Sequence, residues 1–412
     1  MLYKKRIQEN KIKELANFFK VIFLVGARQV GKSSLLIHLY PDTKIFVFDP
    51  IQDQYNIRQD PDLFLKSFNP PLILDEVQFV PEVLPSLKRK VDLIDKKGQY
   101  FLTGSQQMSI LKNVSESLAG RVALIKIGIM SPQEIYSEFD CKKNWFLKYL
   151  ANPDNFYKED FSIIANIPSV YETIWRGGMP GTIELPDSAL FTYFSSYLQT
   201  YVERDVRLLE NINDLATFGR FVALISALTA QEINFSQLGR EIGISPATAQ
   251  RWLNILIYSY QWMTLTAFDN NSIKRIASKG KGMITDTGFA CYLQRISSPD
   301  ALAGHPMLGA FFESYCFNML KSFCTALNTE PNFYHWRTLA GAEIDILLEI
   351  DGKFFPIEVK CKSYVNKHDA RGIMAFRQTY PHLNIQKGII IYAGSICYPL
   401  SEDIIAVPWN LE

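Results

Sequence analysis

Residues 21–36 read VIFLVGARQVGKSSLL, in which an apolar run leads through a glycine-rich turn into an amphipathic stretch. This pattern predicts a strand, a phosphate-binding loop and a helix. Two glycines let the chain turn tightly and direct successive N–H groups toward phosphate oxygens, while the helix N-terminus adds partial positive charge. Lys32 is expected to reach the β- and γ-phosphates, and the spacing from Gly26 selects Ser33 rather than Ser34 as the Mg²⁺ ligand. A turn that holds nothing is the alternative.

A second apolar run, PLILDEVQ at 71–78, places Asp75 and Glu76 at its C-terminal end. Parallel sheets bind their ligands at that end of the strands. Asp75 suits the outer shell of Mg²⁺, and Glu76 is placed to polarise the attacking water, although a solvated strand-end carboxylate is the alternative for Glu76. The pattern predicts Mg²⁺-dependent ATP hydrolysis. The predicted nucleotide-binding residues are Gly26, Ala27, Arg28, Gln29, Val30, Gly31, Lys32, Ser33, Ser34, Asp75 and Ser105, with Glu76 and Lys32 as catalytic groups.

Polar groups also follow or precede two further apolar runs. Residues 100–104 end in Ser105-Gln106-Gln107, which are placed to touch the γ-phosphate or the attacking water, or to serve as turn residues. Arg121 stands just before VALIKI. It is predicted either to reach the nucleotide of a neighbouring subunit as a charge-stabilising catalytic finger or to form a salt bridge. The first role requires a homo-oligomer.

Composition sets the remaining bounds. The chain has 412 residues, 48% of them hydrophobic and 21% charged, as expected for about two or three soluble domains. No apolar stretch approaches the ~18 residues of a membrane span, and the N-terminus lacks a signal-peptide core, so we expect a cytoplasmic protein without a membrane partner. The six cysteines form no CxxC pair. A net charge of +1 requires any nucleic-acid binding to use a local patch.

The pattern changes along the chain predict its organisation. From 21 to about 130, apolar strands alternate with helical stretches such as 82–95, which predicts a parallel α/β sheet. Residues 44–50, KIFVFDP, add a strand, as in additional-strand ATPases with a catalytic glutamate. From about 131 to 230 the sequence becomes helical and aromatic, with a sharp break at 176–181, RGGMPG.

Residues 213–268 have the rhythm of three helices followed by a hairpin, which predicts a winged helix. Ser236 and Ser245 are the expected caps of the second and third helices. The hairpin strands are expected at WMTLTAF and at IKRI (273–276), on either side of a wing at 269–272. Such a module either reads DNA or packs between domains. The residues expected on the outer face of the third helix are Thr248, Gln250, Arg251 and Asn254.

A second chemical site is predicted in residues 341–362, GAEIDILLEIDGKFFPIEVKCK, which alternate as two strands around an Asp-Gly turn. In that register Asp345 faces Glu358 and Glu343 faces Lys360, all on one face of the sheet. Opposed carboxylates are unfavourable without a cation between them, and Mg²⁺ would supply it.

We therefore predict Asp345 and Glu358 as metal ligands alongside Ser33 and Asp75. Lys360 is then a catalytic residue that would orient or help deprotonate a metal-bound water for attack on a phosphodiester. A salt-bridge lattice joining Glu343 to Lys360 is the alternative.

The Glu-x-Lys strand after Asp345 resembles the PD-(D/E)xK nuclease superfamily, and Glu313 in GAFFESYCFNML matches its helical acid, although Ala-Glu-Ile-Asp replaces the usual Pro-Asp. The whole chain resembles prokaryotic AAA+-like ATPases that join a phosphate-loop domain, a winged helix and a restriction-endonuclease-like domain. The motifs that carry this resemblance are GARQVGKS, LILDEVQ, LTGSQ, SLAGR, RGGMP, YVERDV (201–206) and GAEIDILLE followed by IEVK.

The resemblance implies ATP binding and a multidomain α/β fold. The expected domains are a phosphate-loop ATPase at 1–135, a helical linker at 136–212, a winged helix at 213–295 and a nuclease-like domain at 296–412. Nucleic acid is the expected target, with DNA as a candidate partner of the winged helix and the C-terminal domain. The rival is a nucleotide-driven signalling or defence switch whose C-terminal domain only binds a partner.

Overall fold

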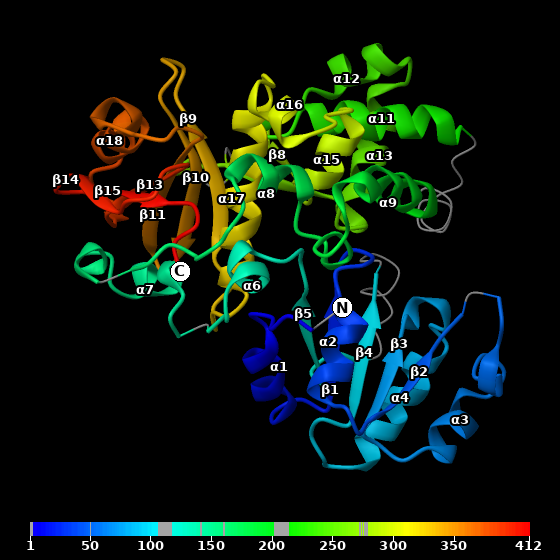
Figure 1. Ribbon diagram of the computed structural model, residues 1–412. Helices are drawn as coiled ribbons and strands as arrows, with labels where there is room; N and C mark the ends of the chain where they lie inside the picture. Colours follow the sequence, from blue (N-terminus) through cyan, green and yellow to red (C-terminus); the bar gives the residue numbers. More distant parts are fainter. Residues whose placement is uncertain are drawn as a thin grey trace. The chain divides into compact units, whose positions relative to one another are not determined.

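The computed structural model describes residues 3–49, 51–105, 118–140, 142–159, 161–201, 214–271, 273, 275 and 279–412. The chain divides into two compact units (Figure 1). The first is Met1–Gly128 with Ile255–Gln261, and the second is Ile129–Asn254 with Trp262–Glu412. The predicted phosphate contacts Gln106 and Gln107, the stretch 202–213 and wing residue Ser272 lie outside the described residues.

The first unit is built on parallel strands. They are β1 (Val21–Val25), β2 (Lys44–Val47), β3 (Leu72–Asp75), β4 (Tyr100–Gly104) and β5 (Val122–Lys126). Their order in the sheet is β2-β3-β4-β1-β5, with parallel pairing throughout. The strand that separates β1 from β3 in space is therefore β4, whereas the extra strand expected at 44–50 forms the edge. This order brings the carboxyl ends of β1, β3 and β4 side by side.

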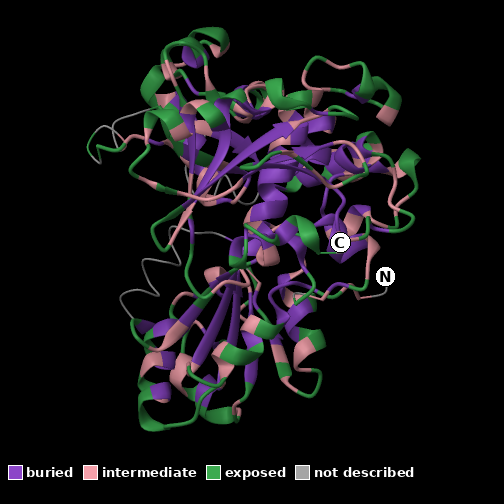
Figure 2. Cartoon of the chain, turned by 90° about the vertical axis from the view of Figure 1, so that its left-hand side faces the viewer, coloured by how far each residue is buried: buried purple, intermediate pink, exposed green. Residues whose placement is uncertain are grey.

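Helices cover this sheet, and its central strands are buried along their whole length (Figure 2). The helices are α1 (Glu9–Ala16), α2 (Lys32–Leu39), α3 (Pro61–Ser67) and α4 (Val83–Leu93). Phe23, Leu74 and Leu102 belong to one core cluster and are fully buried. Continuous burial is the property expected of the central strands of a parallel sheet with both faces covered.

The second unit contains a mixed ten-stranded sheet. Its strands are β6 (Gln231–Glu232), β7 (Trp262–Ala267), β8 (Lys281–Ile284), β9 (Asn332–Arg337), β10 (Glu343–Ile350), β11 (Lys353–Lys360), β12 (Asn384–Ile385), β13 (Gly388–Tyr392), β14 (Tyr398–Ser401) and β15 (Ile404–Pro408). The order is β14-β15-β13-β11-β10-β9-β7-β8-β6, with β12 beside β11. Because β7 pairs with β9, the sheet runs across the boundary expected between 295 and 296.

The helices between residues 129 and 412 are α6 (Pro132–Tyr136), α7 (Trp145–Ala151), α8 (Val170–Arg176), α9 (Asp187–Thr200), α11 (Leu215–Ala227), α12 (Phe235–Ile242), α13 (Pro246–Tyr258), α15 (Thr287–Leu293), α16 (Pro299–Ala303), α17 (Leu308–Cys324) and α18 (Arg371–Thr379). Both α17 and α18 pack on the sheet, each in contact with β11. The break predicted at 176–181 is the end of α8. There Gly178 N donates to the buried Asp286 carboxylate at 2.8 Å.

The three helices and the hairpin after residue 213 occur in the expected order, with two corrections. Asn234, not Ser236, caps α12, because its Oδ1 accepts from the backbone N–H groups of Ser236 and Gln237. The second hairpin strand is β8, which pairs with β7. Of the stretch where that strand was expected, Ile273 is 77% exposed and helical, and Lys274 and Ile276 lie outside the described residues.

Candidate functional site

The loop after β1 has the shape of a phosphate cradle. A Cβ atom on Gly26 would lie 2.1 Å from the carbonyl oxygen of Ile127, so only glycine fits there. Gln29 and Gly31 have φ values of 60° and 89°, and α2 begins directly afterwards at Lys32. Left-handed residues before a helix N-terminus turn successive N–H groups toward one point, which is how such loops bind anions.

Lys32 is folded back onto this loop. Its ammonium group donates to the carbonyl oxygens of Gly26 at 3.0 Å and Ala27 at 2.7 Å, and the residue is only 5% exposed. The buried Arg6 stabilises the loop by donating to the carbonyl oxygens of Val30 and Gly128, each at 2.8 Å. The sequence analysis missed Arg6, because nothing in its surroundings marks it as a partner of the loop. Of the other predicted contacts, Val30 is buried, Arg28 is half-buried, and Gln29 and Ser34 are exposed.

Ser33 and Asp75 meet at the carboxyl ends of β1 and β3. The Ser33 hydroxyl donates to Asp75 Oδ1 at 2.6 Å, and Thr103 Oγ1 at the end of β4 donates to the same oxygen at 2.5 Å. A hydroxyl and a carboxylate are the oxygen ligands that Mg²⁺ prefers. The donor set of Ser33 and Asp75 therefore fits the predicted ion.

Glu76 follows in a left-handed conformation, with φ 59° and ψ 45°. Non-glycine residues adopt this region rarely, and they do so chiefly where the surrounding structure imposes it at functional sites. Glu76 N donates to Thr103 Oγ1 at 3.0 Å, and its carboxylate accepts from Gln78 Nε2. The same amide donates to the buried Ser105 at 3.0 Å. The sequence analysis missed both Thr103 and Gln78, although each belongs to a motif that it singled out.

Arg121 lies at the end of the strands opposite the phosphate loop. It precedes β5, whose first residue pairs with Val21 at the start of β1, whereas the phosphate loop follows the end of β1. Its guanidinium group donates to the Asp92 carboxylate through Nε at 2.5 Å and through Nη2 at 3.0 Å. Hydrogen bonding to Arg121 lowers the pKa of Asp92. Within this chain Arg121 therefore forms the salt bridge. A role at the nucleotide of a neighbouring subunit stays a prediction.

The C-terminal hairpin has the predicted register. Ile350 pairs with Lys353 and Ile346 with Ile357, while Asp351 and Gly352 form the turn with φ values of 50° and 72°. This register places Asp345 opposite Glu358. The Glu343–Lys360 pair of the alternative salt-bridge lattice is not what the structure records, because the exposed Glu343 contacts Arg337 at 4.0 Å.

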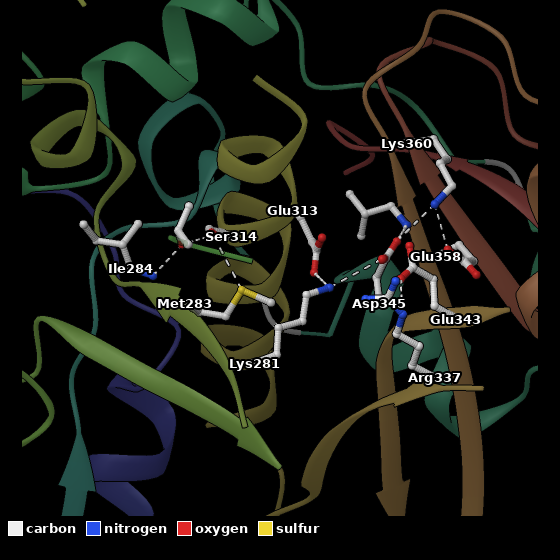
Figure 3. A network of polar contacts seen from close by, with 12 residues as sticks. Lys281, Met283, Ile284, Glu313, Ser314, Arg337, Glu343, Asp345, Glu358 and Lys360 are labelled. Carbon is white, nitrogen blue, oxygen red and sulfur yellow. Dashed lines mark hydrogen bonds and ion pairs between the residues drawn. The ribbon is translucent and has the colours of Figure 1, made fainter. Parts of the chain in front are cut away.

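Two lysines meet three carboxylates beside this hairpin (Figure 3), and we call the group the carboxylate centre: Lys281, Glu313, Asp345, Glu358 and Lys360. Lys360 Nζ is 3.2 Å from Asp345 Oδ2 and 2.8 Å from Glu358 Oε2. Lys281 on β8 forms an ion pair with Glu313 of α17 and lies 3.6 Å from Asp345 Oδ1. The sequence analysis missed Lys281, which is distant in sequence from its partners.

Burial and charge perturb the acids of this centre in opposite directions. Burial, reinforced by the charge of Asp345, raises the pKa of Glu313 to about 8 and that of Glu358 well above its ordinary value. Burial alone would raise the pKa of Asp345 too, but the charges of Lys281 and Lys360 lower it to about 2. Despite burial, the neighbouring carboxylates raise the pKa of both lysines.

The metal ion expected at Asp345 and Glu358 does not fit this arrangement. The cation between those two carboxylates is the Lys360 ammonium group, and Val359 N donates to Asp345 Oδ2 at 2.9 Å. Within the described part of the chain, no cluster of three or more His, Cys, Asp or Glu side chains is arranged to hold a metal ion.

Three families match parts of this chain. The AAA domain family matches residues 18–136. This part of the chain, which holds β1 to β5 and the phosphate cradle, is therefore similar to AAA domains. A domain of unknown function (DUF8612) matches residues 167–300, and another (DUF4143) matches residues 308–411. In the described ranges, no helix has the length and apolar character needed to cross a bilayer.

Individual relatives add little about function. Uncharacterized proteins of Mycobacterium tuberculosis and Mycobacterium bovis are each 26% identical over 413 residues, covering 99% of this chain and 84% of theirs. A Walker-type ATPase of Pyrococcus abyssi is 16% identical with a TM-score of 0.41, covering 70% of this chain and 94% of that one. The RuvB Holliday junction branch migration motor of Thermotoga maritima is 15% identical with a TM-score of 0.31, covering 63% and 89%. At TM-scores below 0.5 neither likeness decides the fold.

Proposed function

We propose that this chain is a Mg²⁺-dependent ATP hydrolase whose catalytic groups lie at the carboxyl ends of β1, β3 and β4. The observation that carries the proposal is the convergence of Lys32, Ser33, Asp75 and Glu76 beside one phosphate cradle. The match of residues 18–136 to the AAA domain family supports the proposal. The ion, when bound, would neutralise phosphate charge.

Each residue has a definite task in this mechanism. Lys32 would exchange its hydrogen bonds to the loop carbonyls for bonds to phosphate oxygens, and Ser33 and Asp75 would hold Mg²⁺. Glu76 accepts the proton of the attacking water. Thr103 fixes both acids, because it donates to the carboxylate of Asp75 and accepts from the N–H group of Glu76.

We further propose that residues 213–295 are a winged helix, that residues 296–412 have a nuclease-like fold, and that nucleic acid is the target of ATP hydrolysis. The order α11, β6, α12, α13, β7, β8, in which β8 pairs with β6 and β7, supports the first part. Gln250 and Arg251 are exposed on α13, and their side chains are of types that bind bases and phosphates. The Asp345–Glu358–Lys360 hairpin supports the second part.

A nucleotide-driven switch whose C-terminal domain only binds a partner is the second candidate. The two ammonium groups inside the carboxylate centre favour it, because they stand where a nuclease metal is expected.

Hydrolysis of ATP by the full chain, measured with Mg²⁺ and with a chelator, tests the first proposal. Glu76→Gln is expected to bind ATP normally and to lose turnover by about 10²-fold or more, because an amide cannot accept the water's proton. Glu82→Gln, which changes an exposed glutamate directly before α4, is the matched control. Turnover by Glu76→Gln at the parent rate would contradict the assignment of the base.

Addition of single-stranded or duplex DNA to the same assay separates the two candidates. Stimulation of hydrolysis, reduced by Arg251→Ala and unchanged by Lys142→Ala in the exposed loop before α7, supports the nucleic-acid target. An active ATPase that responds to neither form of DNA supports the switch instead.

A further inference from the structure

We propose that the ammonium groups of Lys281 and Lys360 permanently occupy the cation positions of the carboxylate centre, so that this centre holds no divalent ion, and that Lys281 fastens strand β8 to helix α17 and strand β10. The inference concerns a different site from the proposed ATPase and does not depend on it.

Three of the four carboxylate oxygens of Asp345 and Glu358 already face nitrogen donors. Asp345 Oδ1 faces Lys281 at 3.6 Å, while its Oδ2 accepts from Val359 N at 2.9 Å and lies 3.2 Å from Lys360 Nζ. Glu358 Oε2 accepts from Lys360 at 2.8 Å. A hard divalent ion needs about six oxygen ligands, including waters, and here nitrogen donors stand in those positions.

The backbone of α18 lies directly against the Glu358 carboxylate. A Cβ atom on Gly372 would lie 2.3 Å from Glu358 Oε1 and 1.7 Å from the backbone carbonyl oxygen of Glu343. Asp345 and Glu358 are 4% and 2% exposed. Little room is left beside them for the water molecules that complete the shell of a bound Mg²⁺.

Lys281 joins separate elements of the second unit (Figure 3). It comes from β8, whereas Glu313 belongs to α17 and Asp345 to β10. The side chains of Lys281 and Glu313 are 11% and 12% exposed. Burying such a pair is favourable only when the charges compensate each other, and removing one partner leaves a buried charge without compensation. Lys281 is thus placed as a permanent cation in the middle of the second unit.

Binding of Mn²⁺ to the full chain, followed by calorimetric titration without nucleotide, tests the proposal. Every variant also carries Asp75→Asn, which removes the acidic ligand of the proposed nucleotide site, so that failure of the ATPase proposal leaves this test intact. We expect the background chain to take up no Mn²⁺ that depends on Asp345. Lys281→Met should also take up no Mn²⁺ that depends on Asp345, because Lys360 and the backbone of α18 stay in place. In urea titrations it should unfold at a lower urea concentration than Lys281→Arg, because the buried acids lose the cation that joins β8 to α17 and β10.

Two controls accompany these variants. Lys281→Arg keeps the cation and should bind no Mn²⁺, and Lys279→Met removes an exposed lysine two residues earlier and should behave as the background chain does. If the background chain binds Mn²⁺ and loses it on Asp345→Asn, the proposal is overturned. A Lys281→Met chain that resists urea as well as Lys281→Arg does would show that this ammonium group fastens nothing, and overturns it equally. Should Lys281→Met not fold, the comparison of the background chain with Asp345→Asn still decides between the two outcomes.

Discussion

The hydroxyl of Thr103 lies 2.5 Å from the carboxylate of Asp75, so that a side chain on β4 holds the acidic residue of the neighbouring strand β3. The same oxygen accepts the N–H group of Glu76, whose backbone is in the left-handed region. One threonine thus fixes the position of the proposed Mg²⁺ ligand and the conformation of the proposed base.

Replacing Thr103 by the isosteric valine removes both hydrogen bonds while keeping the volume of the side chain. We expect the free energy of unfolding to fall by about 1–3 kcal/mol, because buried polar groups lose their partner. ATP hydrolysis should fall by roughly 10- to 100-fold, as it does when groups that orient metal ligands are removed. Thr379→Val, at an exposed helical position, is the control. Unchanged turnover in Thr103→Val would show that Asp75 needs no such support.

Lys32→Ala is expected to weaken ATP binding by roughly 10- to 100-fold, since a charge-assisted hydrogen bond is worth about 1.5–3 kcal/mol. Titration with a fluorescent ATP analogue measures the dissociation constant. Lys96→Ala, at an exposed position in the same unit, should bind like the parent chain. Equal affinity of Lys32→Ala and the parent chain would place the nucleotide elsewhere.

Arg121 and Asp92 offer a test of action between subunits. Arg121→Ala mixed with Glu76→Gln should recover part of the hydrolysis that each lacks alone, because some interfaces then pair an intact acid with an intact arginine. Asp92→Asn weakens the salt bridge within the chain and should leave that recovery in place. Full activity of a chain that sedimentation shows to be monomeric would rule out this role.

Glu313 predicts a dependence of stability on pH. Its pKa of about 8 in the folded chain exceeds the ordinary value of about 4.3, so between these two values the folded chain keeps a proton that the unfolded chain has released. The free energy of unfolding should therefore fall as pH rises through this window. Urea titrations at several pH values should show a flatter dependence for Glu313→Gln, with Glu402→Gln at an exposed turn as the control. The same slope in Glu313→Gln and the parent chain would contradict the perturbed pKa.

The parts of the structure that sequence reasoning anticipated depend on neighbours in the chain. Residues 21–36 contain the strand, loop and helix in succession, and Asp351-Gly352 fixes the register of the hairpin locally. The positions of Ser33 beside Asp75 and of Asp345 opposite Glu358 follow from those local rules together with the order of parallel strands.

What sequence reasoning missed depends on contacts distant in the chain. Lys281 reaches Glu313 and Asp345 only because β8 enters the same sheet as β10, and no spacing in the sequence encodes that meeting. Asn234, not the expected Ser236, caps α12. Either residue type can accept hydrogen bonds from the first N–H groups of a helix, so residue type alone does not choose between them. The edge position of β2 likewise depends on pairing, not on its own residues.

The pairing of β7 with β9 has a practical consequence for dissecting the molecule. A fragment that began after residue 295 would lose Thr266 and Ala267 from beside Tyr334 and His335, and would leave β9 as a bare outer strand with unsatisfied N–H and C=O groups. It would also lose Lys281 and leave the buried acids Glu313 and Asp345 without that cation. Such a fragment is expected to aggregate, so the C-terminal sheet should be expressed together with the segment that precedes it.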